Sequence, residues 1–393
     1  MTTDEIRRLE DAFQIPTYAK LPLALVRGEG RSVWDADGTR YLDFYGGHCV
    51  TLLGHAPPRV VEAVRRQAGR LLFYSNVAYN DVRARAAALL AAMAPGGLGH
   101  AFFCNSGTEA NETALKLARK TTGRSGIVAM EGGFHGRTLG SLAATWNPHY
   151  RDPYAAVLAP TRFVPFGDAA AAEDALAAEA DVAAVILEPI QSMAGIVEAP
   201  PAYFERLRAA CDRHGALLIF DEVQTGVGRT GTFSISEALG VRPDLITLAK
   251  SLGSGVPVGA VLASDAVAAG VETGDQGSTF GGSPLAMAAL EATLATIRDD
   301  ALMPRAAAIE AGIREVAGAL GLGVRGRGCL LGLVLGRPAK PVLAALRAHG
   351  VLAGGSGDPH VIRLMPPLTT TPGDLDAFAT ALDAALHETP AAV

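Results

Sequence analysis

LLIFDEVQTGVGRTG, residues 217–231, is the stretch that decides the fold. Its four apolar residues end abruptly in two carboxylates, Asp221 and Glu222, and a glycine-rich loop follows. The apolar run is too short to span a membrane, and it has the length of a strand in a parallel sheet buried on both faces. Because ligands bind outside the carboxyl ends of such strands, Asp221 stands where a ligand is expected.

The chain around this strand has the alternation of an α/β protein with a mostly parallel sheet. From about residue 100 to 265, strand-like runs alternate with alanine-rich helical stretches, as in βαβ units. Before this block, GRSVWDADGTRYLDF (30–44) predicts a hairpin with a two-residue turn at Asp37-Gly38. After it, GGSPLAMAALEATLATI (281–297) begins a long helix that leads into a smaller C-terminal domain. The expected strands are HAFFCNSG (100–107), GIVAM (126–130), VAAVILEPI (182–190), ALLIFDEV (216–223), DLITLAK (244–250) and PVGAVLAS (257–264).

Composition narrows the functional class. With 393 residues, 49% hydrophobic and 19% charged, the chain can bury a large core and is expected to form more than one domain. A net charge of -6 with scattered basic residues argues against nucleic acid and favours small metabolites as partners. The four cysteines form no CxxC pair and the N-terminal stretch is charged, so we expect a cytoplasmic protein with no export signal, no membrane segment and no zinc.

The stretch FFCNSGTEANETALKLARK (102–120) is the first with evident chemistry. A strand runs through Ser106, Gly107 and Thr108 directly into an amphipathic helix, so amide groups, hydroxyls and the helix dipole converge on one point. That point suits a phosphate, although an ordinary helix N-cap that binds nothing remains an alternative. The stretch lacks the GxxxxGK pattern, which disfavours ATP.

Two further stretches carry reactive or planar side chains at expected strand ends. GGFHGRTLGSLAATW (132–146) places Phe134, His135 and Arg137 on a glycine-flanked loop, where function is more common than packing. Without a planar ligand, Phe134 is better explained as core, and Arg137 can be a surface charge. Lys250 ends an apolar strand, and burial would lower its pKa from about 10.4 and make it a nucleophile. A lysine that extends into water is the alternative.

Taken together, these residues describe pyridoxal 5′-phosphate (PLP), which has a phosphate, a flat ring, a pyridine nitrogen and an aldehyde. Asp221 is expected to keep the ring nitrogen protonated, and Lys250 to condense with the aldehyde. Glu222 is expected to serve a local hydrogen-bond network. A metal site that uses both carboxylates is the competing account, but no histidine or third acid accompanies them at ligand spacing.

The chain resembles a class III aminotransferase of PLP fold type I, and it is most similar to the acetylornithine aminotransferase group. The resemblance covers nearly the whole chain, in the motifs GEGRSVWDADGTRYLDF, NSGTEANE, FHGRT, ILEPIQ, FDEVQTGVGRTG, LAK, GSTFGGSPLA and VIRLMPPL. It implies a large PLP-binding domain over residues 46–280 with a mostly parallel central sheet. It also implies a smaller α/β domain built from both ends of the chain, residues 1–45 and 281–393.

The same resemblance implies residue roles in cofactor binding. Lys250 and Asp221 are catalytic, Phe134 stacks on the ring, and Gln224 reaches the phenolic oxygen. Thr279 reaches the phosphate of the neighbouring subunit, which implies a homodimer with shared active sites. The full set expected to contact the cofactor is Ser106, Gly107, Thr108, Phe134, His135, Asp221, Val223, Gln224, Lys250, Ser278 and Thr279.

For substrates, the resemblance implies two arginines with separate tasks. Arg137 binds the carboxylate of an ω-amine donor, and Arg363 binds the α-carboxylate of glutamate or 2-oxoglutarate. Glu188 masks Arg363 while the donor is bound; a purely structural Glu188–Arg363 ion pair is the alternative. The expected reaction converts N-acetylornithine and 2-oxoglutarate to N-acetylglutamate semialdehyde and glutamate.

Two departures from the family pattern leave the donor open. Where the acetylornithine group usually reads EPIQGEGG, this chain has EPIQSMAGI (188–196), so Met193 replaces an acid and a less charged donor tail becomes possible. His48 in YGGHC either binds the donor or is a satisfied polar residue at the domain joint. Carrier-protein-bound lysine, ornithine, 4-aminobutyrate and diamines remain alternative donors, and a PLP-binding relative without turnover is the alternative to an enzyme.

Overall fold

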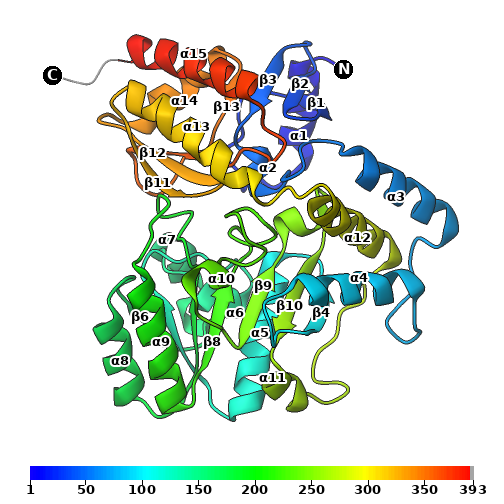
Figure 1. The fold of residues 1–393 in the computed structure, drawn as a ribbon, viewed down its shortest axis with the longest axis vertical. Helices are drawn as coiled ribbons and strands as arrows, with labels where there is room; N and C mark the ends of the chain where they lie inside the picture. Colours follow the sequence, from blue (N-terminus) through cyan, green and yellow to red (C-terminus); the bar gives the residue numbers. More distant parts are fainter. Residues whose placement is uncertain (390–393) are drawn as a thin grey trace.

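A seven-stranded sheet forms the centre of the larger part of the computed structural model, which describes residues 1–389 (Figure 1). The strand order is β4-β10-β9-β8-β7-β5-β6, and only β10 runs antiparallel to its neighbours. The mostly parallel α/β sheet expected from the sequence is therefore confirmed. The strands are β4 (His100–Cys104), β5 (Gly126–Met130), β6 (Thr161–Val164), β7 (Val182–Leu187), β8 (Leu217–Asp221), β9 (Leu245–Leu248) and β10 (Gly259–Ala263).

Both faces of this sheet are covered, which explains its continuous apolar strands. In β8, Ile219 packs into the cluster that contains helix α5 (Gly107–Thr122), whereas Leu218 and Phe220 pack on the side of α8 (Ala169–Ala178) and α9 (Pro201–His214). Successive side chains of a strand point to opposite faces, so the residues of a central strand covered on both faces are mostly apolar. All six expected strands are present; only the edge strand β6 was not predicted.

A second group of elements combines the two ends of the chain. Strand β13 (Val351–Leu352) lies parallel to β3 (Arg40–Asp43), which continues through β2 (Ser32–Asp35) to β1 (Leu25–Glu29). The hairpin predicted around Asp37-Gly38 is present, but Ala36 to Thr39 connect its strands, so the turn is longer than the predicted two residues. A three-stranded sheet joins β11 (Gly323–Arg327), β12 (Leu330–Val334) and β14 (Val361–Leu364).

Helices surround these sheets and connect them. Helix α12 (Pro284–Asp299) packs against α3 (Pro58–Arg70) and α4 (Asp81–Met93) between the two groups of elements (Figure 1). The expected domain limits stay a prediction, and their last four residues, 390–393, lie outside the described part. No helix within residues 1–389 is long and apolar enough to cross a bilayer. The remaining helical elements are α1 (Thr3–Phe13), α2 (Gly46–Cys49), α6 (Leu139–Ala143), α7 (Pro148–Arg151), η1 (Asp152–Val157), α10 (Ile235–Leu239), η2 (Lys250–Gly253), α11 (Asp265–Ala269), α13 (Arg305–Ala319), α14 (Ala339–Ala348) and α15 (Pro372–Glu388).

Candidate active site

A cavity of about 840 Å³ opens at the carboxyl ends of the parallel strands. This is the edge of an α/β sheet where ligands bind. The segments that follow β4, β5, β7, β8 and β9 all contribute to its wall. Of the residues predicted from the sequence, those that line the cavity are His48, Ser106, Gly107, Thr108, Phe134, His135, Arg137, Glu188, Asp221, Val223, Gln224 and Lys250. Ser278, Thr279 and Arg363 are not among the residues that line it.

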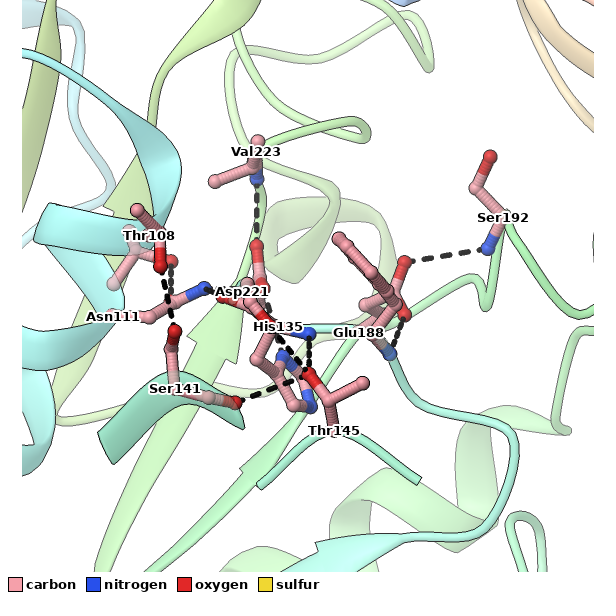
Figure 2. A network of polar contacts seen from close by, with 12 residues as sticks. Thr108, Asn111, His135, Ser141, Thr145, Glu188, Ser192, Asp221 and Val223 are labelled. Atoms are coloured by element: carbon pink, nitrogen blue, oxygen red, sulfur yellow. Dashed lines mark hydrogen bonds and ion pairs between the residues drawn. The ribbon is translucent and has the colours of Figure 1, made fainter. Parts of the chain in front are cut away.

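Asp221 is the centre of a hydrogen-bond network at the floor of the cavity (Figure 2). One carboxylate oxygen accepts from Asn111 Nδ2 at 2.7 Å and from His135 Nδ1 at 2.8 Å. The other accepts from the Val223 amide at 3.1 Å. Asn111 is in turn oriented by the Thr247 hydroxyl, which donates to Asn111 Oδ1 at 2.7 Å. The carboxylate is thus fixed from three sides before any ligand arrives.

The partners of His135 indicate its tautomer. Its Nδ1 faces the Asp221 carboxylate and must donate, whereas its Nε2 is buried without a partner in the described chain. An Nε2 without hydrogen leaves only an acceptor site unused, but an N–H there would be a buried donor without an acceptor. The tautomer that carries its hydrogen on Nδ1 therefore fits these partners.

Sequence reasoning missed Asn111 and Thr247. Asn111 lies three residues after Thr108 on α5, where it and Thr113 are the polar members of an otherwise apolar, alanine-rich set of buried residues. Thr247 is the polar residue in the fully buried strand β9. A buried polar side chain requires a partner, so polar residues in these two apolar stripes were the available signal.

The start of α5 has the form expected of an anion site. Ser106 caps the helix by accepting from the Glu109 amide at 3.3 Å, so the N-cap alternative is also present. Within residues 1–389, the amides of Gly107 and Thr108 have no hydrogen-bond acceptor. A Cβ on Gly107 would lie 2.9 Å from Val223 Cγ2, so only glycine lets Val223 approach the helix start. Capping and anion binding are therefore compatible here.

Lys250 lies two residues after the end of β9 and lines the same cavity. Burial lowers its pKa from the usual value, while Cys49, Asp221 and Glu188 oppose that shift. Its φ of 44° lies in the left-handed region, which is strained for a residue with a side chain. Lys250 is thus strained, lies in a cavity rather than in open water, and has an amine that loses its proton more readily. These observations favour a nucleophilic lysine over one that extends into water.

Phe134 and Gln224 both line the cavity. The Phe134 amide donates to Glu188 at 2.8 Å, and the Phe134 ring lies 6.1 Å from that of Tyr150. The side-chain oxygen of Gln224 accepts from the Ser192 hydroxyl at 3.0 Å. Arg137, at the exposed rim, stacks over Tyr150 with its Cζ 4.5 Å from the ring centre.

His48 is presented by an unusual backbone. Residues 46–49 have φ values of 59°, 54°, 68° and 66°, which is a turn of left-handed helix that includes two residues with side chains. Asp43 stabilises it by accepting from the amides of Tyr45, Gly46 and Gly47. The His48 ring contacts the Tyr45 hydroxyl, and burial together with the charges of Lys250 and Arg363 lowers its pKa to about 4. His48 is thus an uncharged hydrogen-bonding group near pH 7.

The structural ion pair considered for Glu188 and Arg363 is not formed. Glu188 accepts instead from the amides of Phe134 at 2.8 Å and Ser192 at 3.4 Å (Figure 2). Burial and the charge of Asp221 raise the pKa of Glu188. Masking of Arg363 was predicted for the donor-bound state only, and it stays a prediction.

Ser278 and Thr279 lie on the loop before α12, outside this cavity. The Ser278 hydroxyl accepts from Asn105 Nδ2 at 3.4 Å and from the Gly281 amide at 2.9 Å. Thr279 is exposed, as is its neighbour Phe280. Its predicted contact with a second subunit therefore also stays a prediction.

The acid behind Asp221 behaves as the sequence indicated. Glu222 is buried and accepts from the Thr225 hydroxyl at 3.2 Å, the Ile235 amide at 2.8 Å and the Ser234 hydroxyl. Its expected role in a local hydrogen-bond network is confirmed. Among residues 1–389, no three histidine, cysteine, aspartate or glutamate side chains are grouped as a metal site would require.

The family model described as aminotransferase class-III matches residues 14–386. The chain belongs to this family. This aminotransferase is 47% identical over 388 residues to an acetylornithine aminotransferase of Methanopyrus kandleri, with 97% of this chain and 98% of the relative covered. Its fold is similar to that of acetylornithine aminotransferase from Elizabethkingia anophelis, with a TM-score of 0.85, 31% identity, and 99% of this chain and 100% of the other covered.

An ornithine aminotransferase from Toxoplasma gondii, whose crystal structure has partial occupancy of PLP at the active site, gives a TM-score of 0.91. Its identity to this chain is 30%, and the comparison covers 98% of this chain and 94% of the other. This aminotransferase is therefore an enzyme of the amino-transfer class, as the sequence predicted.

Proposed function

We propose that this aminotransferase uses PLP to transfer the ω-amino group of N-acetylornithine to 2-oxoglutarate. The products are N-acetylglutamate semialdehyde and glutamate. The observation that carries the proposal is Asp221, a buried anion fixed by three hydrogen bonds in the cavity that also holds Lys250. The donor is chosen because the 47% identical relative is an acetylornithine aminotransferase, whereas the ornithine aminotransferase is 30% identical.

The cavity residues fit each part of PLP. The unpaired amides of Gly107 and Thr108 at the start of α5 suit its phosphate. Asp221 suits the protonated ring nitrogen, and the Phe134 ring offers a face for stacking. When bound, PLP supplies an electron sink for the charge that develops on the carbon bearing the amine.

Lys250 has two tasks in this proposal. Its amine would hold PLP covalently, and the same amine, when free, would move the proton at the substrate carbon that bears the reacting nitrogen. A lowered pKa serves both tasks, because the amine must be unprotonated to attack and to accept a proton. His135 and Asn111 hold Asp221 in one orientation, so its charge needs no rearrangement during the reaction.

Substrate recognition uses the wall of the cavity. Arg137 at the rim binds the donor carboxylate, and Arg363 binds the α-carboxylate of 2-oxoglutarate. His48 is uncharged because burial lowers its pKa, and the Arg363 guanidinium lies close enough to lower it further. A donor with a second free ammonium is disfavoured there, and an N-acylated one is not.

We also propose a homodimer. Two exposed apolar segments support it: the first is residues 71–79, and the second is the loop around Phe280 before α12. Asn76 of the first segment links them, because its Nδ2 donates to the Gly281 carbonyl at 2.8 Å. Phe280 of the second segment is 60% exposed and packs against Phe73 of the first, with ring centres 5.0 Å apart. Exposed apolar patches of this kind mark interaction sites. The exposed apolar residues of the first segment are Leu71, Leu72, Phe73, Tyr74, Val77 and Tyr79.

Thr279, next to Phe280, would then reach the partner's cofactor phosphate. Mixing Lys250→Ala chains with Thr279→Ala chains should restore activity, since one site of a mixed dimer carries neither change. Activity no greater than the sum of the two parents, with subunit exchange demonstrated, would count against a shared site. The proposal places the enzyme in the cytoplasm, in keeping with its four unpaired cysteines.

The reaction is tested by mixing PLP-loaded protein with single amines in a stopped-flow instrument and following the cofactor absorbance. N-acetylornithine should react fastest in a panel with ornithine, 4-aminobutyrate, a diamine and carrier-bound lysine. A faster reaction with another amine would replace the donor. If no amine changes the absorbance, the protein is a PLP-binding relative without turnover.

A further inference from the structure

Arg363 on β14 is buried without an acid to pair with. It is 2% exposed, and within residues 1–389 no carboxylate lies at ion-pair distance. Its Nε donates to the Gly355 carbonyl at 2.6 Å, and its Nη1 to the Ser192 hydroxyl at 3.1 Å and to the Met193 sulfur at 3.2 Å. Neutral groups thus take the place of the counter-ion that a buried guanidinium usually requires.

Met193 covers this guanidinium on the side of the cavity. Met193 and Tyr45 both line the cavity, whereas Arg363 does not. The Tyr45 ring centre lies 5.9 Å from Arg363 Cζ. A carboxylate that enters the cavity therefore meets the thioether and the phenol before it can reach the cation.

Glu188, the nearby acid, is separated from Arg363 by Ser192. The Ser192 amide donates to Glu188 at 3.4 Å, and the Ser192 hydroxyl accepts from Arg363 and donates to Gln224. Glu188 is further held by the Phe134 amide. Met193, in the position where the sequence departs from the usual acid, contacts Arg363 directly beside Ser192.

The backbone of Met193 is fixed, but its side chain can rotate. The Met193 carbonyl accepts from the Gly357 amide at 2.7 Å, so this segment is tied to the loop before β14. Methionine has three rotatable bonds and no branching, and it adopts alternative conformations at little cost. Exposing Arg363 then requires only a rotamer change, with no separation of charges.

We propose that Met193 is a specificity-determining residue, an uncharged and movable cover that opens Arg363 to the α-carboxylate of a dicarboxylate. This inference rests on the proposed function, and it identifies dicarboxylates as the class of ligand that binds next to Arg363. A carboxylate at position 193 would have to be displaced from the guanidinium by each incoming α-carboxylate, whereas a thioether does not compete. Dicarboxylates should therefore bind readily to the resting PLP-loaded enzyme, and 2-oxoglutarate should inhibit the donor half-reaction at high concentration.

The test uses glutarate, a dicarboxylate with no amine or keto group, so that binding is measured without turnover. Isothermal titration calorimetry on PLP-loaded protein gives its Kd for wild type, Met193→Glu, Met193→Gln and Met193→Ala. Met193→Glu should weaken glutarate binding at least about tenfold, as loss of a charge-assisted contact does. Met193→Gln, of equal size but uncharged, should stay within about threefold of wild type. Met193→Ala should bind glutarate as tightly as wild type or more tightly, because the cover is gone.

Equal glutarate affinity in Met193→Glu and Met193→Gln would overturn the inference, because a charge beside Arg363 would then not matter. Absence of glutarate binding to wild type, with binding gained in Met193→Ala, would also overturn it, since Met193 would be a fixed plug. Both results can be distinguished from failure of the proposed function. If the proposed function were wrong, neither wild type nor any variant at position 193 would react with an amine.

Discussion

The floor and the wall of the cavity are built by opposite means. At the floor, Asp221 is held by Asn111, His135 and the Val223 amide, all from elements of one sheet and the helix that packs on it. Behind the wall, Arg363 lies on the strand of another sheet and contacts a carbonyl, a hydroxyl and a thioether. The carboxylate at the floor is paired with hydrogen-bond donors, whereas the cation behind the wall has no anionic partner.

This difference separates chemistry from specificity. A network with several mutual contacts tolerates few substitutions, because each removal leaves a buried polar group unpaired. The wall depends on single side chains, Met193 on the segment between β7 and α9 and His48 in α2. Changes in the wall are thus expected to alter which substrate binds, and changes in the floor to remove the reaction altogether.

The largest effect is expected at the floor, for Lys250→Ala. This variant keeps the phosphate, ring and Asp221 contacts but loses the amine that holds the cofactor and moves the proton. Turnover should fall by about three or more orders of magnitude. Steady-state kcat of the PLP-saturated protein measures this, and Lys340→Ala on the exposed face of α14 is the control.

Reduction of wild type with borohydride followed by peptide mapping gives an independent check. The label should lie on Lys250 alone. A label on another lysine would overturn the assignment of the nucleophile.

A smaller loss is expected for Asp221→Asn, which removes the charge of the floor while keeping its shape. Loss of one preorganised electrostatic group of this kind lowers rates by about 100- to 1,000-fold. The rate of proton transfer in single-turnover experiments with N-acetylornithine is the measurement. Glu222→Gln is the matched control, because it neutralises the adjacent carboxylate, which does not line the cavity. An equal loss in both variants would mean that Asp221 acts through stability only.

The residues of the floor could be predicted from the sequence to a larger extent than those of the wall. Strands β7 and β8 are continuous apolar runs that end in acids, and these patterns located the floor before the structure did. Strand β6 was missed because four residues with an exposed Arg162 carry no periodic signal. Asn111 lay within a recognised motif, but its partner, Asp221, is 110 positions away in the chain.

The wall was less predictable for physical reasons. Residues 46–49 adopt left-handed backbone although His48 and Cys49 have no intrinsic preference for it. Their conformation is imposed by Asp43, whose carboxylate accepts the amides of the turn and is itself bonded to His55. Arg363 was recognised from its motif, but its contact with Met193 joins residues 170 positions apart. Such contacts follow from the packing of the two groups of elements.

In the wall, Arg363→Ala should separate the two half-reactions. Removing the guanidinium deprives 2-oxoglutarate of a charge-assisted contact worth about 1.5–3 kcal/mol, or roughly tenfold to a hundredfold in kcat/KM. The donor half-reaction should change little, since its carboxylate is assigned to Arg137. Single-turnover rates for each half-reaction are the measurement. Equal losses in both would show that the wall and the floor are not separable.

The smallest effect is expected just behind the floor, at Glu222, and it concerns stability and pH. Burial raises the pKa of Glu222 to about 7, against 4.5 for an exposed glutamate. The folded protein therefore binds a proton at this site that the unfolded chain has already lost between pH 4.5 and 7. Stability from this group is complete below about pH 4.5 and is lost as the pH rises through about 7.

Glu222→Gln removes this dependence, so the variant should gain stability relative to wild type as the pH rises from 5 to 8. This rise in the pKa of Glu222 corresponds to about 3 kcal/mol at most, and relaxation around a buried charge reduces it to on the order of 1–2 kcal/mol. Urea unfolding of the PLP-loaded proteins at both pH values measures the difference, in which all other titrations cancel. Glu205→Gln on the exposed side of α9 should show no such trend. If the stability of Glu222→Gln relative to wild type is the same at pH 5 and pH 8, Glu222 titrates normally despite its burial, and the inference that burial raises its pKa is wrong.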